Sequence, residues 1–215
     1  MALGHRAVKL GFWPERTFLC GMALDANYWE GRYQEGNTPW DMNQASPPLT
    51  GFLQNRKNPN LEILIPGAGS AHEAEWLWRH GFQQVHVLDY SASALAKFRA
   101  RTPDFPVGHL HQEDFFAHRR RYDLILEQTF FCALDPELRS QYAQHCASLL
   151  RPGGMLVGLL FNFPLTEQGP PFGGSEQEYR DLFLPHFKLY KLEPCYNSIP
   201  PRQGRELFIW LLKAS

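Results

Sequence analysis

LEILIPGAGSA, residues 61–71, says more about the architecture of this chain than any other segment. Its apolar half is short, rich in branched aliphatic residues and stopped by Pro-Gly, which is typical of a buried parallel strand. Gly67 and Gly69 then let the backbone turn tightly and come close to a ligand. The amphipathic segment 71–80 places a helix N-terminus beside that ligand, and Asp89, after the next apolar run, offers a carboxylate to a ribose diol. The pattern predicts a site for a nucleoside-containing cofactor.

The third small residue of the turn distinguishes between cofactor types. A dinucleotide fingerprint has Gly or Ala five positions after the first glycine, where this chain has His72. The spacing Gly67-x-Gly69-x-Ala71 is instead similar to that of class I S-adenosylmethionine-dependent methyltransferases, with alanine in place of the usual third glycine. A glycine turn alone is a weak signal, because any α/β domain can contain one.

Strand and helix patterns alternate through the rest of the chain. We expect strands at 61–66, 84–89, 107–111, 122–127 and 154–161, and helices at 27–34, 47–56, 72–80, 92–101, 136–150 and 175–184. The last two apolar runs, 187–192 and 205–212, flank a turn-rich segment and predict a hairpin. The predicted fold class is α/β: a class I methyltransferase, Rossmann-like fold with a mostly parallel seven-stranded sheet, a C-terminal antiparallel hairpin strand and helices on both faces.

Composition favours a single compact domain. The 215 residues, 44% hydrophobic and 20% charged, suit a domain that buries roughly 70% of its unfolded surface. The net charge is -1 and the basic residues are scattered, so we expect no nucleic-acid partner. No apolar stretch approaches the roughly 18 residues that cross a bilayer, so we expect no membrane partner either. The expected protein is a monomer that acts on a small-molecule substrate.

Cysteine and histidine spacing gives no sign of a metal centre. The four cysteines form no CxxC pair and are expected to be free thiols in a reducing cytoplasm: Cys20, Cys132, Cys146 and Cys195. His109 and His111 would share one face of a strand, but no acidic or cysteine partner is recognised at ligand spacing. We therefore predict no metal ligand.

The first residues do not fit the pattern of the rest. Residues 1–21 carry basic side chains around an aromatic cluster without a continuous hydrophobic segment, which makes a poor secretion signal. We predict an N-terminal extension over 1–21 and a methyltransferase domain over 22–215. Met22 is a candidate initiator, a hypothesis that mass spectrometry of natively produced protein would test.

A set of short motifs runs along the whole domain: YWEGRY at 28–33, TPWD at 38–41, PGAG at 66–69, TFFCAL at 129–134, LRPGG at 150–154 and GPPF at 169–172. Together they resemble the thiopurine S-methyltransferase family and its relatives, the plant and bacterial halide/thiol methyltransferases. The resemblance covers about residues 28–212, and TPWD and FFCA are much more specific than the glycine turn. It implies an S-adenosylmethionine-dependent enzyme that methylates sulfur or halide nucleophiles.

The resemblance also assigns cofactor contacts. It places aromatic contacts on Trp29, Tyr33 and Trp40, and an electron-rich ring face attracts a sulfonium centre by about 0.5 to 2 kcal/mol. The other contacts follow the chain: Gly67, Ala68 and Gly69 for the amino-acid part, Asp89 for the ribose, Tyr90 as a further cofactor contact, Asp114 and Phe115 for adenine, and Glu127 and Gln128 for the ammonium group or the substrate. Trp29 and Tyr33, four residues apart, fit the core side of a helix equally well, and Asp114 fits a helix N-cap.

Glu127 is the candidate catalytic residue, because it ends the fourth strand at the edge where open α/β sheets bind ligands. A carboxylate there fits a turn cap as well. The candidate substrate residues are Trp40, Phe131, Phe172 and Arg205, although Arg205 also fits a surface position on the hairpin. Phe172 stands where relatives often have tyrosine, so a phenolic donor for a halide is missing.

These patterns predict methyl transfer from S-adenosylmethionine to a small nucleophile, most readily a thiol or another sulfur compound. Two alternatives stay open. The first is a non-catalytic S-adenosylmethionine-binding protein on the same scaffold, since Ala71 and Phe172 depart from the family pattern. The second is an NAD(P)-dependent oxidoreductase, which His72 and the terminal hairpin disfavour. The sequence leaves open which compound accepts the methyl group.

Overall fold

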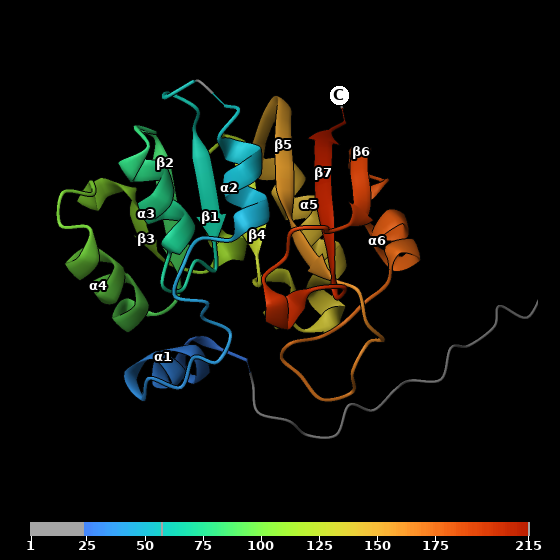
Figure 1. The fold of residues 1–215 in the computed structure, drawn as a ribbon, viewed down its shortest axis with the longest axis horizontal. Coiled ribbons are helices and arrows are strands. Elements are labelled where there is room, and N and C mark those ends of the chain that lie inside the picture. The colour runs from blue at the N-terminus through green and yellow to red at the C-terminus, as the bar shows by residue number, and fades with distance from the viewer. Residues whose placement is uncertain (1–23, 57, 215) are drawn as a thin grey trace, which may run out of the picture.

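A computed structural model describes residues 24–56 and 58–214 (Figure 1). The strands are β1 (Ile63–Pro66), β2 (Val85–Asp89), β3 (Leu110–Gln112), β4 (Tyr122–Gln128), β5 (Leu150–Phe161), β6 (Phe187–Pro194) and β7 (Glu206–Lys213). The α-helices are α1 (Ala26–Gln34), α2 (Pro47–Leu53), α3 (His72–Arg79), α4 (Ala92–Arg101), α5 (Arg139–Leu149) and α6 (Glu176–Phe183). Short 3-10 helices are η1 (Val107–His109), η2 (Phe115–Ala117), η3 (Phe131–Ala133), η4 (Pro136–Leu138) and η5 (Pro200–Arg202). The predicted extension, 1–21, lies outside the described residues.

All seven strands form one sheet in the order β3-β2-β1-β4-β5-β7-β6. The first five pair in parallel, whereas β7 runs antiparallel to both β5 and β6. The predicted hairpin and the predicted α/β class are confirmed. Because the chain moves outward from β1 to β3 and then returns to β4, the direction of winding changes between β1 and β4. An open α/β sheet binds its ligands at such a point.

Strand alternation divides the core into two layers. Ile63, Ile65 and Val87 pack with α2, α3 and α4 on one face of the sheet. On the other face, Leu64 and Ile125 pack with residues of α5 and α6. Helix α1 belongs to neither layer: it lies beyond the ends of the central strands and contacts α4 (Figure 1). Every helix in the described part of the chain is too short or too polar to span a bilayer.

Two predicted elements differ in detail. The segment expected as a strand at 107–111 begins as the 3-10 helix η1, closed by a bond from the His109 N–H to the Pro106 carbonyl, and only Leu110–Gln112 pairs with β2. The predicted helix 136–150 divides into η4 and α5, and β5 starts directly afterwards at Leu150. In the pairing of β5 with β4, Leu150 lies opposite Tyr122 and Met155 lies opposite Leu124. The Arg-Pro-Gly-Gly segment between them forms a bulge, with Gly153 at φ 75°.

Candidate cofactor and substrate site

One cavity, with a volume of about 1780 Å³, lies at the carboxyl ends of β1, β2 and β4. Its lining comes from α1, the segment after α1, the glycine turn after β1, the ends of β2 and β4, the segment 161–172 and η5. Ligand pockets usually measure about 300–1,000 Å³, so this cavity has room for a cofactor and a second molecule.

The glycine turn has an alternating left-handed backbone. Gly67, Gly69 and Ala71 have φ values of 54°, 53° and 52°. A Cβ atom at Gly67 would lie 2.2 Å from the Phe130 ring, and one at Gly69 would lie 2.2 Å from the Tyr33 hydroxyl. Both glycines are therefore required by backbone conformation and by close packing. Ala71 adopts the same conformation with a side chain, which explains why glycine is common at this position in similar turns.

Asp89 joins the end of β2 to the glycine turn. Its Oδ2 atom accepts the N–H of Gly69 at 2.7 Å, and Oδ1 accepts the N–H of Ser91 at 2.8 Å. Burial raises the pKa of Asp89, and the two backbone N–H groups oppose that rise. Each carboxylate oxygen keeps a further lone pair, so Asp89 can still accept hydrogen bonds from the two hydroxyls of a ribose.

Three aromatic residues expected at the cofactor lie together on the cavity wall. The ring centroid of Trp40 is 5.4 Å from that of Trp29 and 5.9 Å from that of Tyr33, with edge-on geometry in both pairs. The Trp40 indole N–H donates to the Tyr33 hydroxyl at 3.2 Å. Trp40 also has the guanidinium of Arg32 5.2 Å from its ring centroid, so this ring already attracts one cation.

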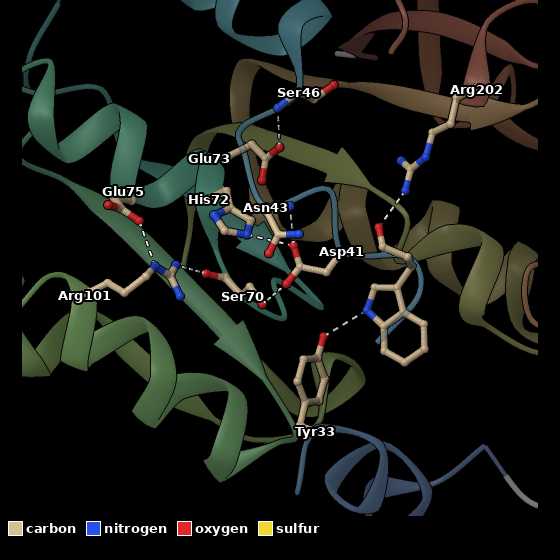
Figure 2. A network of polar contacts seen from close by, with 11 residues as sticks. Tyr33, Asp41, Asn43, Ser46, Ser70, His72, Glu73, Glu75, Arg101 and Arg202 are labelled. Atoms are coloured by element: carbon tan, nitrogen blue, oxygen red, sulfur yellow. Dashed lines mark hydrogen bonds and ion pairs between the residues drawn. The ribbon is translucent and has the colours of Figure 1, made fainter. Parts of the chain in front are cut away.

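The segment between α1 and α2 is tied to the glycine turn and to the C-terminal part of the chain (Figure 2). The Asp41 carboxylate accepts the Ser70 hydroxyl and contacts His72 Nε2 at 2.8 Å. Partial burial by itself would raise the pKa of Asp41, but the bonds from His72 and Ser70 hold this pKa well below its usual range. Arg202, in η5, donates from Nη2 to the Trp40 carbonyl at 2.8 Å. These contacts hold the Trp40 indole over the cavity.

Helix α1 is connected to α4 by a set of partly buried hydrogen bonds. The Glu30 carboxylate accepts the hydroxyls of Ser91 at 2.7 Å and Ser93 at 2.5 Å, and these bonds lower the pKa of Glu30 to about 2. Lys97 of α4 donates to the Tyr33 carbonyl at 2.5 Å. Trp29 and Tyr33 are thus held against the cavity by polar contacts as well as by packing.

The predicted adenine residues lie on the β3 side of the cavity. Asp114 caps η2 by accepting the Phe116 N–H at 2.8 Å through Oδ1, so its N-cap role is real, and the residue lines the cavity as well. Phe115 is buried and also lines the cavity. Partial burial, together with the neighbouring Asp114 carboxylate, raises the pKa of Tyr90 to about 12. One carboxylate and two rings are therefore available to a purine at this end.

Glu127 does not occupy the place that the sequence suggested. Its side chain is fully buried and absent from the cavity lining, because it points to the face of the sheet covered by α5. It accepts the N–H groups of Phe130 and Phe131, both at 2.9 Å, and the Tyr142 hydroxyl at 2.5 Å. Burial raises the pKa of Glu127 to about 7, against these hydrogen bonds. The structure thus places the Glu127 carboxyl group outside the cavity lining, where it supports the turn after β4 in which Thr129 has φ 59°. A catalytic or ligand-binding role for Glu127 stays a prediction.

Gln128 fits a polar ligand better. It lines the cavity at the end of β4, and both its side-chain amide atoms are buried without a hydrogen-bond partner among the described residues. A buried amide is costly when its hydrogen bonds are unmade. A bound group with donors and acceptors, such as the amino-acid end of S-adenosylmethionine, would satisfy both atoms.

The predicted substrate residues divide into two groups. Trp40, Phe172 and Arg205 line the cavity, and the Arg205 guanidinium lies 4.7 Å from the Phe163 ring centroid. Phe131 is buried in the core beneath α5 and α6 and is not part of the cavity lining, so its contact with a substrate stays a prediction. Its neighbour Phe130 lines the cavity instead.

Several residues of the site were not singled out from the sequence. Asp41, Ser70 and His72 form the network beside the glycine turn, and Arg202 reaches the cavity from η5. Asp41 belongs to the TPWD motif, which was a usable signal. His72 was considered only as a departure from the dinucleotide pattern.

Comparison with known proteins agrees with this geometry. The model of the Thiopurine S-methyltransferase (TPMT) family matches residues 24–207. Thiocyanate methyltransferase 1 of Arabidopsis thaliana is 32% identical over 198 residues, 88% of this chain and 86% of that protein. Probable thiol methyltransferase 2 of the same plant is 30% identical over 184 residues, 83% of this chain and 81% of that protein. Thiopurine S-methyltransferase of Vibrio campbellii is 29% identical over 179 residues, 74% of this chain and 82% of that protein.

Among solved structures, the Burkholderia thailandensis 1,6-didemethyltoxoflavin-N1-methyltransferase, with bound 1,6-didemethyltoxoflavin and S-adenosylhomocysteine, has a TM-score of 0.72. It is 16% identical in sequence, and the match covers 97% of this chain and 94% of that chain. The fold is that of a class I methyltransferase. The chain belongs to the thiopurine S-methyltransferase family, and it is an S-adenosylmethionine-dependent methyltransferase.

Proposed function

We propose that this enzyme methylates a small sulfur nucleophile that reacts as an anion. The observation that carries the proposal is the arginine at the substrate end of the cavity. Arg202 Nη1 is buried and makes no hydrogen bond with any residue that the structure describes; its ion-pair contact there is Glu206 Oε1 at 3.5 Å. A buried donor of this kind is well suited to a thiolate or a similar sulfur anion. The curated relatives named thiol, thiocyanate and thiopurine methyltransferases support the same class of acceptor.

The rest of the substrate end is aromatic. The rings of Phe130, Phe161, Phe163 and Phe172 line the cavity, and the Arg202 guanidinium lies 5.7 Å from the Phe161 ring centroid. Apolar walls exclude water and strengthen the attraction between the guanidinium and an anion. The favoured acceptor therefore joins an anionic sulfur to a small apolar or aromatic body.

S-adenosylmethionine supplies an electrophilic methyl group, and the residues of this chain bind and orient it. In the proposed arrangement Asp89 accepts the ribose hydroxyls, Asp114, Tyr90 and Phe115 surround the adenine, and Gln128 meets the amino-acid end. The rings of Trp29, Tyr33 and Trp40 stand beside the sulfonium centre. The glycine turn, with Ala68 at its centre, lets the cofactor approach the backbone.

Positioning the sulfur nucleophile against the methyl group then provides most of the rate enhancement. A thiol with a pKa near 8.5 is only a few per cent ionised at neutral pH, so binding the anion gains at most about 2 kcal/mol. Holding the sulfur in line with the methyl group provides a larger advantage, up to about 7–11 kcal/mol in favourable systems. No strong base is needed, which agrees with the absence of Glu127 from the cavity lining.

A methyl-transfer assay tests the proposal. Labelled S-adenosylmethionine is incubated with the full chain and a panel containing thiocyanate, bisulfide, an aromatic thiol and a thiopurine, beside the matching phenol, an amine and iodide. We expect transfer to the sulfur compounds and little to the others. For Arg202→Gln we expect a higher KM for anionic sulfur and a smaller loss of cofactor affinity, because Arg202 also holds the Trp40 carbonyl. Preferred methylation of the amine or the phenol would contradict the proposal.

We also propose that the enzyme works as a monomer in a reducing compartment such as the cytoplasm, without a nucleic-acid partner. The lining of the cavity comes from one chain, and Cys132, Cys146 and Cys195 are buried free thiols. The net charge of -1 offers no cationic surface of the kind that binds nucleic acid. Light scattering of the purified chain tests the monomer.

A further inference from the structure

Four histidines gather at the β3 edge of the sheet, away from the substrate end of the cavity. His86 lies on β2, His109 ends η1, His111 lies on β3 and His118 follows η2. The rings of His86 and His109 are 4.1 Å apart, those of His86 and His111 are 5.3 Å apart, and those of His111 and His118 are 5.0 Å apart, measured between centroids. The proposed methyl transfer uses none of them.

In the sequence, His109 and His111 share one face of a predicted strand, with no acidic partner recognised at ligand spacing. The structure gives His111 different neighbours. Glu113 lies two residues further along the chain, and His118 follows η2. His111, Glu113 and His118 each offer one ligand atom, and these three atoms lie within 4.8 Å of one another. We propose that His111 Nδ1, Glu113 Oε1 and His118 Nδ1 form a binding site for a divalent transition metal of the zinc type.

The distances suit such an ion with little movement. Glu113 Oε1 lies 3.9 Å from His111 Nδ1 and 2.7 Å from His118 Nδ1. Zinc binds nitrogen and oxygen at about 2.0–2.2 Å, so tetrahedral ligands are separated by roughly 3.4 Å. The two observed separations lie on either side of this value. Three protein ligands leave a fourth position for water, since Glu113 is partly exposed at 40% of its side-chain area.

The outer nitrogens of both histidines are held by further groups. His111 Nε2 lies 3.0 Å from Nδ1 of the fully buried His86, and His118 Nε2 lies 2.7 Å from the Tyr122 hydroxyl. Without an ion, His118 Nδ1 donates to Glu113 Oε1 at 2.7 Å, so a metal must displace this proton. With the proton of each ring on Nε2 and donated outward, both Nδ1 lone pairs face the bound ion. Metal-binding histidines are oriented by outer hydrogen bonds of this kind.

The positive charge of Arg120 near the site opposes a cation, but the Glu62 carboxylate partly offsets it. Arg120, which acts electrostatically on these histidines, is bound to Glu62 at 3.0 Å, and His86 Nε2 lies 3.4 Å from the same carboxylate. Imidazole and carboxylate together favour zinc, nickel or copper over magnesium or calcium, which prefer oxygen ligands alone.

Calorimetry with Zn²⁺ tests the site on the untagged, chelator-treated full chain. We expect one ion per chain at this site, and a tenfold or greater loss of affinity in His111→Ala and in Glu113→Gln. Glu113→Gln changes one partly exposed group and keeps the side-chain shape, so it is expected to fold. The matched control is His80→Ala, an exposed histidine on α3 outside the cluster, which should leave the affinity unchanged. Co²⁺ in place of Zn²⁺ should give the intense visible absorption of a tetrahedral ion, and Glu113→Gln should abolish it.

Two results would overturn the proposal. One is the absence of saturable Zn²⁺ binding by a chain whose circular dichroism is native. The other is binding that stays equally tight in His111→Ala and Glu113→Gln, which would place the ion elsewhere in the chain. Neither result bears on the methyl-transfer proposal, because the assay for that reaction involves no metal.

Discussion

Asp89 performs two tasks with one carboxylate. It accepts the Gly69 and Ser91 N–H groups and so fixes the turn, and its remaining lone pairs face the place proposed for the ribose. A residue with both tasks affects folding and binding together. The two effects can be separated, because the affinity is measured on the folded protein alone.

For Asp89→Ala we expect the free energy of S-adenosylmethionine binding to fall by about 1.5 to 3 kcal/mol, the usual size for hydrogen bonds to a charged group. This is roughly a tenfold to hundredfold loss of affinity by calorimetry. The control is Asp181→Ala, which removes an exposed carboxylate whose hydrogen-bond partner in the described part of the chain is Gln177. Unchanged affinity in a folded Asp89→Ala protein would remove the ribose assignment.

Glu127 makes stability depend on pH in the direction opposite to most carboxyl groups. Its pKa is about 7 in the folded chain, against 4.5 for an ordinary glutamate, so folding takes up a proton between these values. The contribution is fully present below pH 4.5 and is lost as pH rises towards 7. It amounts to at most about 3 kcal/mol.

In Glu127→Gln we expect this part of the pH dependence to disappear from urea-unfolding curves recorded between pH 4.5 and 7.5. Turnover and cofactor affinity should stay near those of the wild type, since the amide can still accept the Phe130 and Phe131 N–H groups. A loss of turnover beyond a hundredfold in a stable protein would support a catalytic role for Glu127.

At the scale of elements, α1 is held by side chains more than by a broad apolar face. Only Tyr33 among its residues is fully buried, and the bonds from Glu30 to Ser91 and Ser93 connect it to the start of α4. The aromatic contacts proposed for the cofactor therefore depend on polar bonds at some distance from them.

For Glu30→Gln we expect faster amide hydrogen exchange within α1 and a loss of about 1 kcal/mol in cofactor binding, because the charge that accepts two serine hydroxyls is removed. Glu35→Gln, at the exposed end of the same helix, is the matched control. Exchange rates in α1 that match those of the control would show that packing alone holds the helix.

Most elements followed from the sequence because local patterns determine them. The apolar runs before Gly67 and Asp89 became β1 and β2, and Ser175 caps α6 as its spacing predicted, by accepting the Glu178 N–H at 3.2 Å. Glu178 itself pairs with Arg139 at 2.6 Å, a partner 39 residues away that no local pattern reveals.

The sequence analysis led to cavity-lining residues where one segment carries its own chemistry, as at the glycine turn and Asp89. It was less informative where a side chain's direction depends on a distant element. Glu127 follows the strand alternation that puts Ile125 against α5, so it faces Tyr142 and not the cavity. Asp41 and His72 meet across 31 residues, and the metal ligand His118 reaches His111 only because η2 reverses the chain.

For the whole molecule, the nucleoside should be the largest source of added stability. S-adenosylhomocysteine at about 100 times its Kd is expected to stabilise the fold by about 2.7 kcal/mol. For a chain of this size that corresponds to a rise in Tm of roughly 5–10 °C in a calorimetric scan. NADH at the same concentration should leave the Tm unchanged. A rise in Tm with NADH alone would favour the oxidoreductase alternative.

The hydrogen bonds that hold α1 and the Trp40 segment also affect how the demethylated cofactor is released. They connect Glu30 to Ser91, Asp41 to Ser70 and the Trp40 carbonyl to Arg202, and none of them is part of the sheet. A few hydrogen bonds can break while every strand stays paired, at far less cost than unfolding. We therefore expect the demethylated nucleoside to leave when these two segments briefly move away from the sheet. The strand ends should keep their conformation and bind the next cofactor molecule.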